Sequence, residues 1–159
     1  MPTDTRLRPE LCNCLAVRQA ARHVTQFYDQ FLATAGLRTM QFSILARLQR
    51  LGPMTISALA ADLVMDRTTL GRNLQPLERE GLVAVVKGRT DRRSREIHLT
   101  DTGAERLRIA IEGWVKAQAG FEAVFGEQRS SELRTLLHAV SASELEGASP
   151  RGLPQERPG

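Results

Sequence analysis

The sequence lacks any apolar run that approaches the ~18 residues needed for a membrane-spanning helix. Its opening stretch, MPTDTRLRPE, also lacks the apolar centre of a secretory signal peptide. We therefore expect a cytoplasmic protein with no membrane partner. Cysteine is scarce as well, with 2 residues in the chain. In a reducing compartment such a pair does not predict a structural disulfide framework.

Sequence motifs of common catalytic sites are missing too. The chain has no glycine-rich phosphate loop, no G-x-S-x-G and no H-E-x-x-H. Its histidines, His23, His98 and His138, are scattered without the spacing of a metal site. These absences predict a protein that is not an enzyme, that needs no cofactor and that has no histidine-based metal site.

Lysine is scarce among the basic residues, so the positive charge is almost entirely arginine. The chain carries 22 basic and 18 acidic residues, a net charge of +4, and 2 of the basic residues are lysines. Arginine presents a planar fork of donors that suits phosphate and guanine. Residues 40–100 hold 10 basic and 6 acidic side chains, so their surplus equals that of the whole chain. Within them, KGRTDRRSR at 87–95 is opposed only by Asp91.

Apolar spacing predicts two helices before this basic segment. Residues 1–9 are interpreted as a flexible polar arm. Apolar positions three to four apart then predict a long amphipathic helix over 10–35, which Gly36 ends. A second helix should follow, capped by Thr39 and ended before Pro53. Its apolar positions are expected to face inward: Phe42, Leu45, Leu48 and Leu51.

A short helix over 56–63 and a longer one over 67–80 are predicted next, with the turn Val64-Met65-Asp66 between them. Asp66 is a strong cap for the longer helix. Pro76 lies inside that helix, and an interior proline removes a backbone hydrogen bond. We therefore expect its last turn to bend.

Two strands, 82–87 and 95–99, predict a β-hairpin with the basic loop at its tip. Helices are expected over 101–125 and 127–141. The Ser-, Gly-, Glu- and Pro-rich tail, 142–159, is expected to be disordered. The predicted fold class is mainly α with a small β-hairpin.

The short helix, the turn and the polar-faced helix have the spacing of a helix-turn-helix, whose second helix enters the major groove of DNA. The adjacent hairpin would act as a wing that follows the phosphate backbone or enters the minor groove, where negative potential favours arginine. A polar helix face or a charged loop alone is usually only solvated, but their adjacency favours DNA binding. The candidate contacts are Arg67, Thr68, Thr69, Arg72 and Asn73 on the helix, and Arg89, Asp91, Arg92 and Arg93 on the wing.

Residues 41–103 resemble the winged-helix core of the MarR family of bacterial transcription regulators. The resemblance is carried by ISALAADL, DRTTLGRNLQPLEREGLV and DRRSREIHLTDTG. Its most specific part is D-x-R followed by LT-x-x-G, matched by Asp91, Arg93, Leu99, Thr100 and Gly103. With the flanking helices, the resemblance covers about residues 10–141.

The resemblance implies a winged helix-turn-helix with dimerisation helices at both ends of the chain. Residues 10–38 and 101–141 would form the dimerisation helices of a homodimer. Residues 39–100 would form the DNA-binding lobe, with a pseudo-palindromic operator in double-stranded DNA as partner. Repression is the expected activity. The alternative is an adaptor with this fold that pairs with a protein and does not bind DNA specifically.

Two wing residues acquire roles from the resemblance. Arg93 resembles the wing arginine that enters the minor groove. Asp91 resembles the acid that braces the wing by pairing with an arginine. An alternative for Asp91 is a turn residue that hydrogen-bonds its own loop.

The resemblance also implies that a small molecule or an oxidant releases the DNA. Cys12 and Cys14 are the first candidates, because free thiols near a dimer interface can be oxidised or can bind a soft metal. Helical residues two apart lie ~200° apart, so a disulfide between subunits is more feasible than one within the chain. The alternative is that both cysteines are small buried hydrophobes.

The second candidates are Arg18, Arg22 and His23 on the first helix, with aromatic side chains nearby. A cationic and aromatic pocket would suit an aromatic carboxylate or a phenol as effector. The alternative is two surface arginines and a core histidine. The aromatic residues concerned are Phe27, Tyr28 and Phe42.

Overall fold

The structure, a computed structural model of the chain, describes residues 8–145. The chain divides into two compact units, Met1–Ala119 and Gly120–Gly159. Because the described residues are 8–145, most of the arm expected over 1–9 and most of the tail expected over 142–159 lie outside them. Where they can be compared, the expected arm and tail each overlap a structured element by one residue, because Pro9 begins a 3₁₀ turn and Ala142 is the last residue of the last helix.

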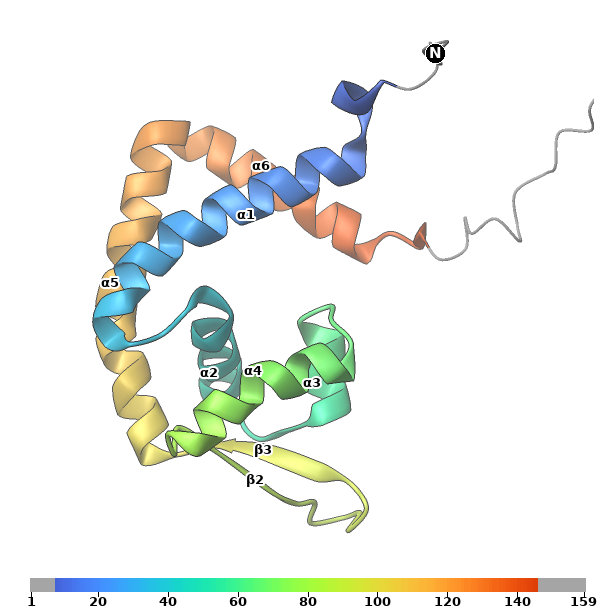
Figure 1. Cartoon of the computed structure of the whole chain (residues 1–159), viewed down its shortest axis with the longest axis vertical. Coiled ribbons are helices and arrows are strands. Elements are labelled where there is room, and N and C mark those ends of the chain that lie inside the picture. Colours follow the sequence, from blue (N-terminus) through green and yellow to red (C-terminus); the bar gives the residue numbers. More distant parts are fainter. Residues whose placement is uncertain (1–7, 146–159) are drawn as a thin grey trace, which may run out of the picture. The chain divides into compact units, whose positions relative to one another are not determined.

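The fold is mainly α with one small sheet, as predicted (Figure 1). No helix in the described part of the chain combines the length and the hydropathy that crossing a bilayer requires. In chain order the elements are η1 (Pro9–Leu11), α1 (Asn13–Leu32), η2 (Ala33–Ala35), α2 (Thr39–Leu51), β1 (Met54–Thr55), α3 (Ile56–Asp62), α4 (Arg67–Arg79), β2 (Val83–Lys87), β3 (Arg95–Leu99), α5 (Asp101–Phe125) and α6 (Glu127–Ala142).

The core of the first unit is aliphatic and joins α2, α3 and α4 to the sheet and to the start of α5. The predictions for α2 need two corrections. Ile44 is buried although it was not predicted to be, whereas Leu51 is 52% exposed in the last turn. Thr39 is the first helical residue, and Arg38 takes the cap position. The fully buried core side chains include Leu32, Ile44, Leu45, Leu59, Leu70, Leu77, Leu82 and Ile97.

The helix-turn-helix forms as predicted from α3 and α4. The Thr55 hydroxyl accepts the Ala58 amide at 3.1 Å and so begins α3. Asp66 begins α4, because its carboxylate accepts the Thr69 amide at 2.8 Å. Between the helices, Val64 has φ 52°. A β-branched residue is rarely found in this left-handed region, so the tight turn is formed at a steric cost.

Pro76 does not end α4, which remains helical to Arg79. The missing amide hydrogen leaves the carbonyl one turn earlier without its helical partner. After the proline the chain resumes its hydrogen bonds, and the Glu80 amide donates to the Pro76 carbonyl at 3.0 Å. The helix therefore reaches its full length before Gly81, whose φ of 71° turns the chain into the hairpin.

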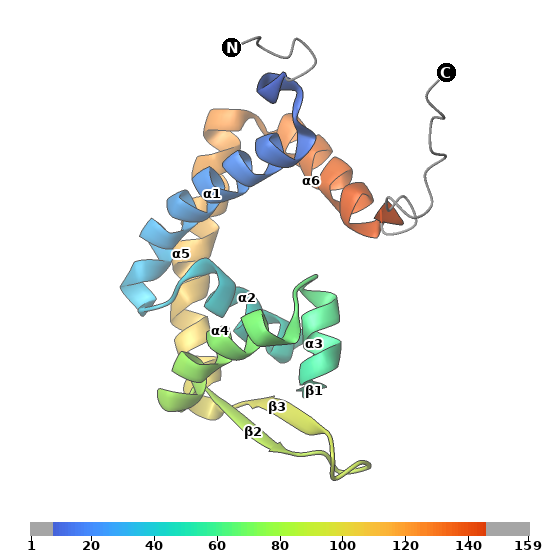
Figure 2. The same ribbon diagram turned by 45° about the vertical axis from the view of Figure 1, so that its right-hand side comes forward.

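The sheet has three antiparallel strands in the order β1-β3-β2. The β2–β3 pairing matches the predicted hairpin, with Val83 opposite Leu99 and Lys87 opposite Arg95. In both views of the ribbon the hairpin extends beyond helices α2–α4 (Figure 2). The third strand, β1, was not predicted, because two residues are too few to show an alternating pattern.

The LT-x-x-G part of the signature forms a close contact between the residues just before β2 and the start of α5. The Thr100 hydroxyl donates to the Gly81 carbonyl at 2.6 Å and accepts the Gly103 amide at 3.0 Å. A Cβ on Gly103 would lie 2.0 Å from the Leu82 carbonyl oxygen. The position therefore requires glycine for space, and the signature reflects close packing at the base of the wing.

Helices α1 and α5 cross at a second close approach within the first unit. A Cβ on Gly113 would lie 2.4 Å from the Phe31 carbonyl oxygen. Near this crossing the Tyr28 hydroxyl hydrogen-bonds the Gln118 side chain. The two helices are therefore held backbone to backbone without a large side chain between them.

The second unit contains the last turns of α5 and all of α6, separated by Gly126 with φ 101°. The Ser130 hydroxyl is buried and donates to the Gly126 carbonyl at 2.7 Å. The Arg129 guanidinium lies 4.3 Å from the centre of the Phe125 ring. These contacts fix the turn between the two helices.

Two glycines in helices should respond oppositely to alanine. Gly103→Ala should lower the free energy of unfolding by about 2 kcal/mol, because its Cβ meets a backbone carbonyl that cannot move aside easily. Gly71→Ala, in α4, should raise it by about 0.5–1 kcal/mol, because no atom lies within 4 Å of the added Cβ. Urea unfolding of both variants measures the difference. Equal effects of the two substitutions would show that the contact at Gly103 is not close.

Candidate nucleic-acid interface

The outer face of α4 carries the predicted helix contacts, but they are not equally free. Arg67, Thr68 and Arg72 are exposed. Thr68 and Arg72 lie on the face opposite the buried leucines of the helix, whereas Arg67 is exposed as the first helical residue, at the start of the leucine side. The Thr69 hydroxyl donates to the Asp66 carboxylate at 2.7 Å, and the Asn73 amide group donates to the Thr69 carbonyl at 2.9 Å. Two of the predicted contacts thus already serve the helix itself.

The start of α4 carries a fixed negative charge. Hydrogen bonds from the Thr69 amide and then from its hydroxyl hold the pKa of Asp66 below its ordinary value of 3.8. The carboxylate is therefore ionised at neutral pH. Its contribution to the stability of the helix is lost only as the pH falls through this lowered pKa. Helix α4 therefore keeps this cap at neutral pH.

Two exposed α4 residues were missed by the sequence prediction. Gln75 and Arg79 are exposed and lie three and seven positions after Arg72, on the same side of the helix. Helical spacing from Arg72 could have identified them. They extend the polar face toward the C-terminal end of α4.

The wing is closed by Asp91 acting as a turn residue. Its carboxylate accepts the Arg93 backbone amide at 2.9 Å, and its carbonyl accepts the Ser94 amide at 3.0 Å. Within residues 8–145 Asp91 forms no ion pair with an arginine. The bracing ion pair predicted from the resemblance is therefore wrong for this structure, and the turn alternative holds. Asp91 shapes the loop, and the Arg93 side chain stays free.

The start of α4, the start of α3 and the returning arm of the wing meet around one polar cavity of about 240 Å³. It brings Arg67 beside Arg93, which are far apart in sequence, and it adds Arg95. Arg95, Thr55 and Ser57 were not among the predicted contacts, because only the fold brings them to this place. The cavity is lined by Thr55, Ile56, Ser57, Arg67, Arg93, Ser94 and Arg95.

The cationic side chains of this surface have no acidic partners. In the part of the chain that the structure describes, no lysine or arginine from 67 to 95 forms an ion pair. Some arginines elsewhere in the described chain are paired, such as Arg47 with Asp62 at 3.0 Å and Arg108 with Glu105 at 2.7 Å, whereas Arg18, Arg22 and Arg50 are not. Unpaired guanidinium groups gathered on one surface form a site for a polyanion.

The cysteines differ from the prediction in two respects. Both thiols are exposed, so the interpretation as buried hydrophobes was wrong. Cys12 is not helical but occupies the extended cap position of α1, and its sulfur accepts the Leu15 amide at 3.4 Å. The helical-angle argument against a disulfide with Cys14 therefore does not apply. Among the described residues no group of three or more His, Cys, Asp or Glu is arranged to hold a metal ion.

The residues predicted for a cationic and aromatic pocket lie on two helices, α1 and α2. Arg18, Arg22 and His23 are exposed on α1, so the core-histidine alternative was wrong. Phe42 is half-buried on α2 and stacks on Trp114, with ring centres 6.2 Å apart. A pocket for an aromatic acid or a phenol at these residues stays a prediction.

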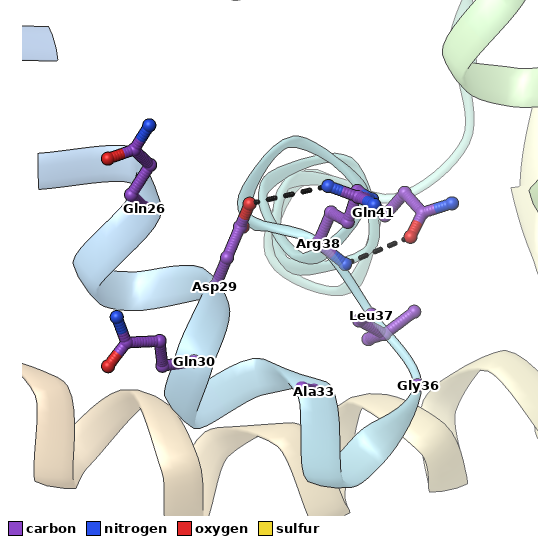
Figure 3. Close-up of a pocket in the computed structure, with 8 residues that line it drawn as sticks. All are labelled: Gln26, Asp29, Gln30, Ala33, Gly36, Leu37, Arg38 and Gln41. Carbon is purple, nitrogen blue, oxygen red and sulfur yellow. Dashed lines mark hydrogen bonds and ion pairs between the residues drawn. The ribbon is translucent and has the colours of Figure 1, made fainter. Parts of the chain in front are cut away.

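A separate cavity of about 620 Å³ lies at the junction of α1 and α2. Figure 3 shows the Asp29 side chain of α1 facing the Arg38 guanidinium, while the Gln41 side chain at the start of α2 accepts the Arg38 backbone amide. The lining is mostly carboxamide and charged, without an aromatic ring. It consists of Gln26, Asp29, Gln30, Ala33, Gly36, Leu37, Arg38 and Gln41.

The comparison with known proteins agrees with this geometry. The MarR family model matches residues 37–94. The chain is 32% identical to the HTH-type transcriptional regulator PecS of Dickeya dadantii over 115 residues, which cover 70% of this chain and 69% of PecS. It is 30% identical to the transcriptional activatory protein BadR of Rhodopseudomonas palustris over 134 residues, which cover 81% of this chain and 75% of BadR.

A solved structure of the M. tuberculosis transcriptional regulator MosR in complex with DNA is also similar. The TM-score is 0.71 and the sequence identity 38%, over 82% of this chain and 97% of the MosR chain. The match thus includes the helices that flank the winged helix. The chain belongs to the MarR family, whose members are DNA-binding transcriptional regulators and not enzymes.

Proposed function

We propose that the protein is a homodimeric, sequence-specific repressor that binds a pseudo-palindromic operator in double-stranded DNA. The observation that carries this proposal is the absence of ion pairs among the cationic side chains of 67–95 within the described residues. Exposed guanidinium groups gathered on one surface attract the phosphates of DNA. The alternative of a protein-only adaptor is tested by the salt dependence of binding to duplex DNA, because phosphate contacts make that dependence steep.

Each structural part has a separate task in DNA binding. Thr68 and Arg72 on α4 face the major groove and read base edges, with Gln75 beyond them. Arg93 on the wing enters the minor groove. Arg67 and Arg95, which share the polar cavity with Arg93, hold backbone phosphates that set the register of the protein on the duplex.

Exposed apolar side chains support the homodimer. In the first unit Leu15 and Val17 on α1, and Ile111 and Val115 on α5, are 39–52% exposed. In the second unit Leu136 and Val140 of α6 are 65% and 50% exposed. Apolar faces of this extent are usually covered by a partner. A two-fold symmetric second copy would cover them and would place two reading heads about one DNA turn apart, ~34–36 Å.

Repression is the direction that we propose, and relatives make it testable. MosR is described in complex with DNA, which supports operator binding. BadR is named as an activatory protein, so the opposite direction occurs among relatives. A reporter under the control of the bound promoter decides between them, since a repressor gives higher expression when its gene is deleted.

Two switches are proposed for release from DNA. The first is oxidation of Cys12 and Cys14 to a disulfide, in which two thiols give two electrons and two protons to a peroxide that is reduced to water. Exposure of both thiols and the capping role of the Cys12 sulfur support it, because a disulfide would withdraw that sulfur from the Leu15 amide. The second is an aromatic acid or phenol, bound where Arg18, Arg22 or Phe42 can reach it in the dimer.

Arg93→Ala should weaken binding to all duplexes about tenfold at physiological salt, because a minor-groove cation acts largely through phosphate potential. The salt slope should also fall by about 1 per lost contact. Fluorescence anisotropy titration measures both quantities. Arg134→Ala is the matched control, because it removes the same charge from α6. An Arg93→Ala affinity equal to that of the control would contradict the wing assignment.

Val115→Glu should convert the dimer to a monomer, because the buried apolar face would then contain an unpaired charge. Sedimentation equilibrium measures the mass, and anisotropy should show operator affinity lost with the dimer. Lys116→Glu, at the exposed neighbouring position, should leave the dimer intact. A wild-type monomer, or a dimeric Val115→Glu variant, would sink the proposed homodimer.

Mild hydrogen peroxide should release the wild-type protein from duplex DNA and leave Cys12→Ser bound, since serine keeps the cap but cannot form the disulfide. Anisotropy before and after oxidation measures release, and mass spectrometry checks the loss of two hydrogens. If both proteins stay bound after oxidation, the redox switch is excluded. Titration of the same complex with benzoate and salicylate then tests the aromatic effector, with release expected at millimolar concentration or below.

A further inference from the structure

Arg106 on α5 joins three helices of the first unit through one side chain. Its Nη1 lies 3.2 Å from the Glu80 carboxylate and 3.4 Å from the Ala35 carbonyl oxygen. Glu80 is the cap residue at the C-terminal end of α4, and Ala35 ends the turn that follows α1. Gly36, with φ 68°, lies close to the same side chain, because a Cβ added at Gly36 would be 3.4 Å from the Arg106 Nη1. The end of the DNA-reading helix is thereby connected to the end of α1.

This connection adds to a second one at the same end of α4. The Thr100 hydroxyl, just before α5, holds the Gly81 carbonyl at 2.6 Å. Thr100, just before α5, and Arg106, in its second turn, therefore contact successive residues, Gly81 and Glu80. Arg106 also reaches Ala35 of η2, the 3₁₀ turn that directly follows α1, and α1 carries exposed apolar side chains.

We propose that Arg106 is a positioning residue for DNA recognition, which fixes the angle of α4 relative to α1 and α5. This inference rests on the proposed function, since it requires two reading heads held at a set separation. A pair of half-sites one turn apart can be read together only if each recognition helix is held rigidly. Without Arg106 the helix must be ordered on the DNA, which costs part of the binding free energy.

The Arg106–Glu80 ion pair is partly exposed, so its effect on DNA binding can be measured separately from its effect on folding. The Arg106 and Glu80 side chains are 31% and 49% exposed, so solvent screens their attraction and the pair contributes little to folding. Loss of either side chain should therefore leave a folded protein. An effect on DNA binding would then come from geometry and not from unfolding.

The chain offers a matched control two positions away. Arg108 is on the same helix but pairs with Glu105 of α5 itself at 2.7 Å, so it connects no second helix. Arg108→Gln and Arg106→Gln remove the same charge at nearly the same distance along α5. Glu80→Gln provides the opposite charge change, because it removes a negative charge near the DNA face and would raise affinity if only electrostatics acted.

The experiment uses the full chain and the duplex that the wild-type protein enriches most strongly from a random-sequence pool. A second duplex carries the same half-sites with two extra base pairs between them. Anisotropy gives the ratio of the two affinities. Arg106→Gln and Glu80→Gln should each weaken binding to the first duplex about tenfold and leave the second unchanged, so the ratio falls. Arg108→Gln should leave the ratio unchanged.

The results that would contradict the positioning role differ from the result that would contradict the proposed function. If Arg106→Gln equals Arg108→Gln, or if it weakens both duplexes alike, Arg106 is not a positioning residue. If Arg106→Gln fails to fold in a thermal melt, Glu80→Gln decides, and a gain in affinity for that variant overturns the proposal. If the wild-type protein enriches no duplex, the proposed function itself fails, and the inference fails with it.

Discussion

The structure depends on the close contact where α5 leaves the sheet. Thr100 and Gly103 sit against the Gly81 and Leu82 carbonyls, at distances that leave no room for a side chain at residue 103. This contact joins the end of the DNA-facing helix, the base of the wing and the start of a 25-residue helix. The reading head and its support are therefore one packed body up to the boundary of the first unit, and Arg106 extends the same connection to α1.

The distribution of ion pairs is a second feature on which the surface of this protein depends. Arginines that hold elements together are paired, as Arg47 is with Asp62 across α2 and α3. Arginines of α4 and the wing are unpaired within the described residues, and the one carboxylate in their loop, Asp91, is used by a backbone amide. Among the described residues, several acids thus pair with arginines outside α4 and the wing, and the cationic side chains of α4 and the wing are left without acidic partners. The same division explains why modest net charge is compatible with DNA binding.

Most of the fold could be predicted from the sequence because its signals are local. The caps at Thr55 and Asp66, the leucine spacing of α4 and the alternation in the hairpin each depend on near neighbours, and all four helices from α3 onward were placed within about two residues. The strand β1 was missed because two residues carry no period. Leu51 was placed inward because helical spacing does not reveal where a helix leaves the core.

The site was predicted less completely, since it depends on contacts between distant segments. The spacing of α4 indicated Arg67 and Arg72, but the meeting of Arg67 with Arg95 and Ser57 arises only from packing. The partner of Asp91 could not be chosen in advance, because a turn amide and a neighbouring guanidinium were both within reach. The sequence also could not place the effector candidates relative to one another, since Arg18, Arg22 and His23 are exposed on α1 while Phe42 packs against Trp114.

The central claim is that the unpaired arginines of each reading head bind DNA phosphates in a dimer. The most direct measurement is the affinity of the wild-type protein for duplex DNA across a series of salt concentrations, with the stoichiometry measured in parallel by sedimentation. The account predicts two chains per duplex and a log–log salt slope of about −6 or steeper, because each head neutralises several phosphates. A slope near zero, or a single chain per duplex, would contradict it.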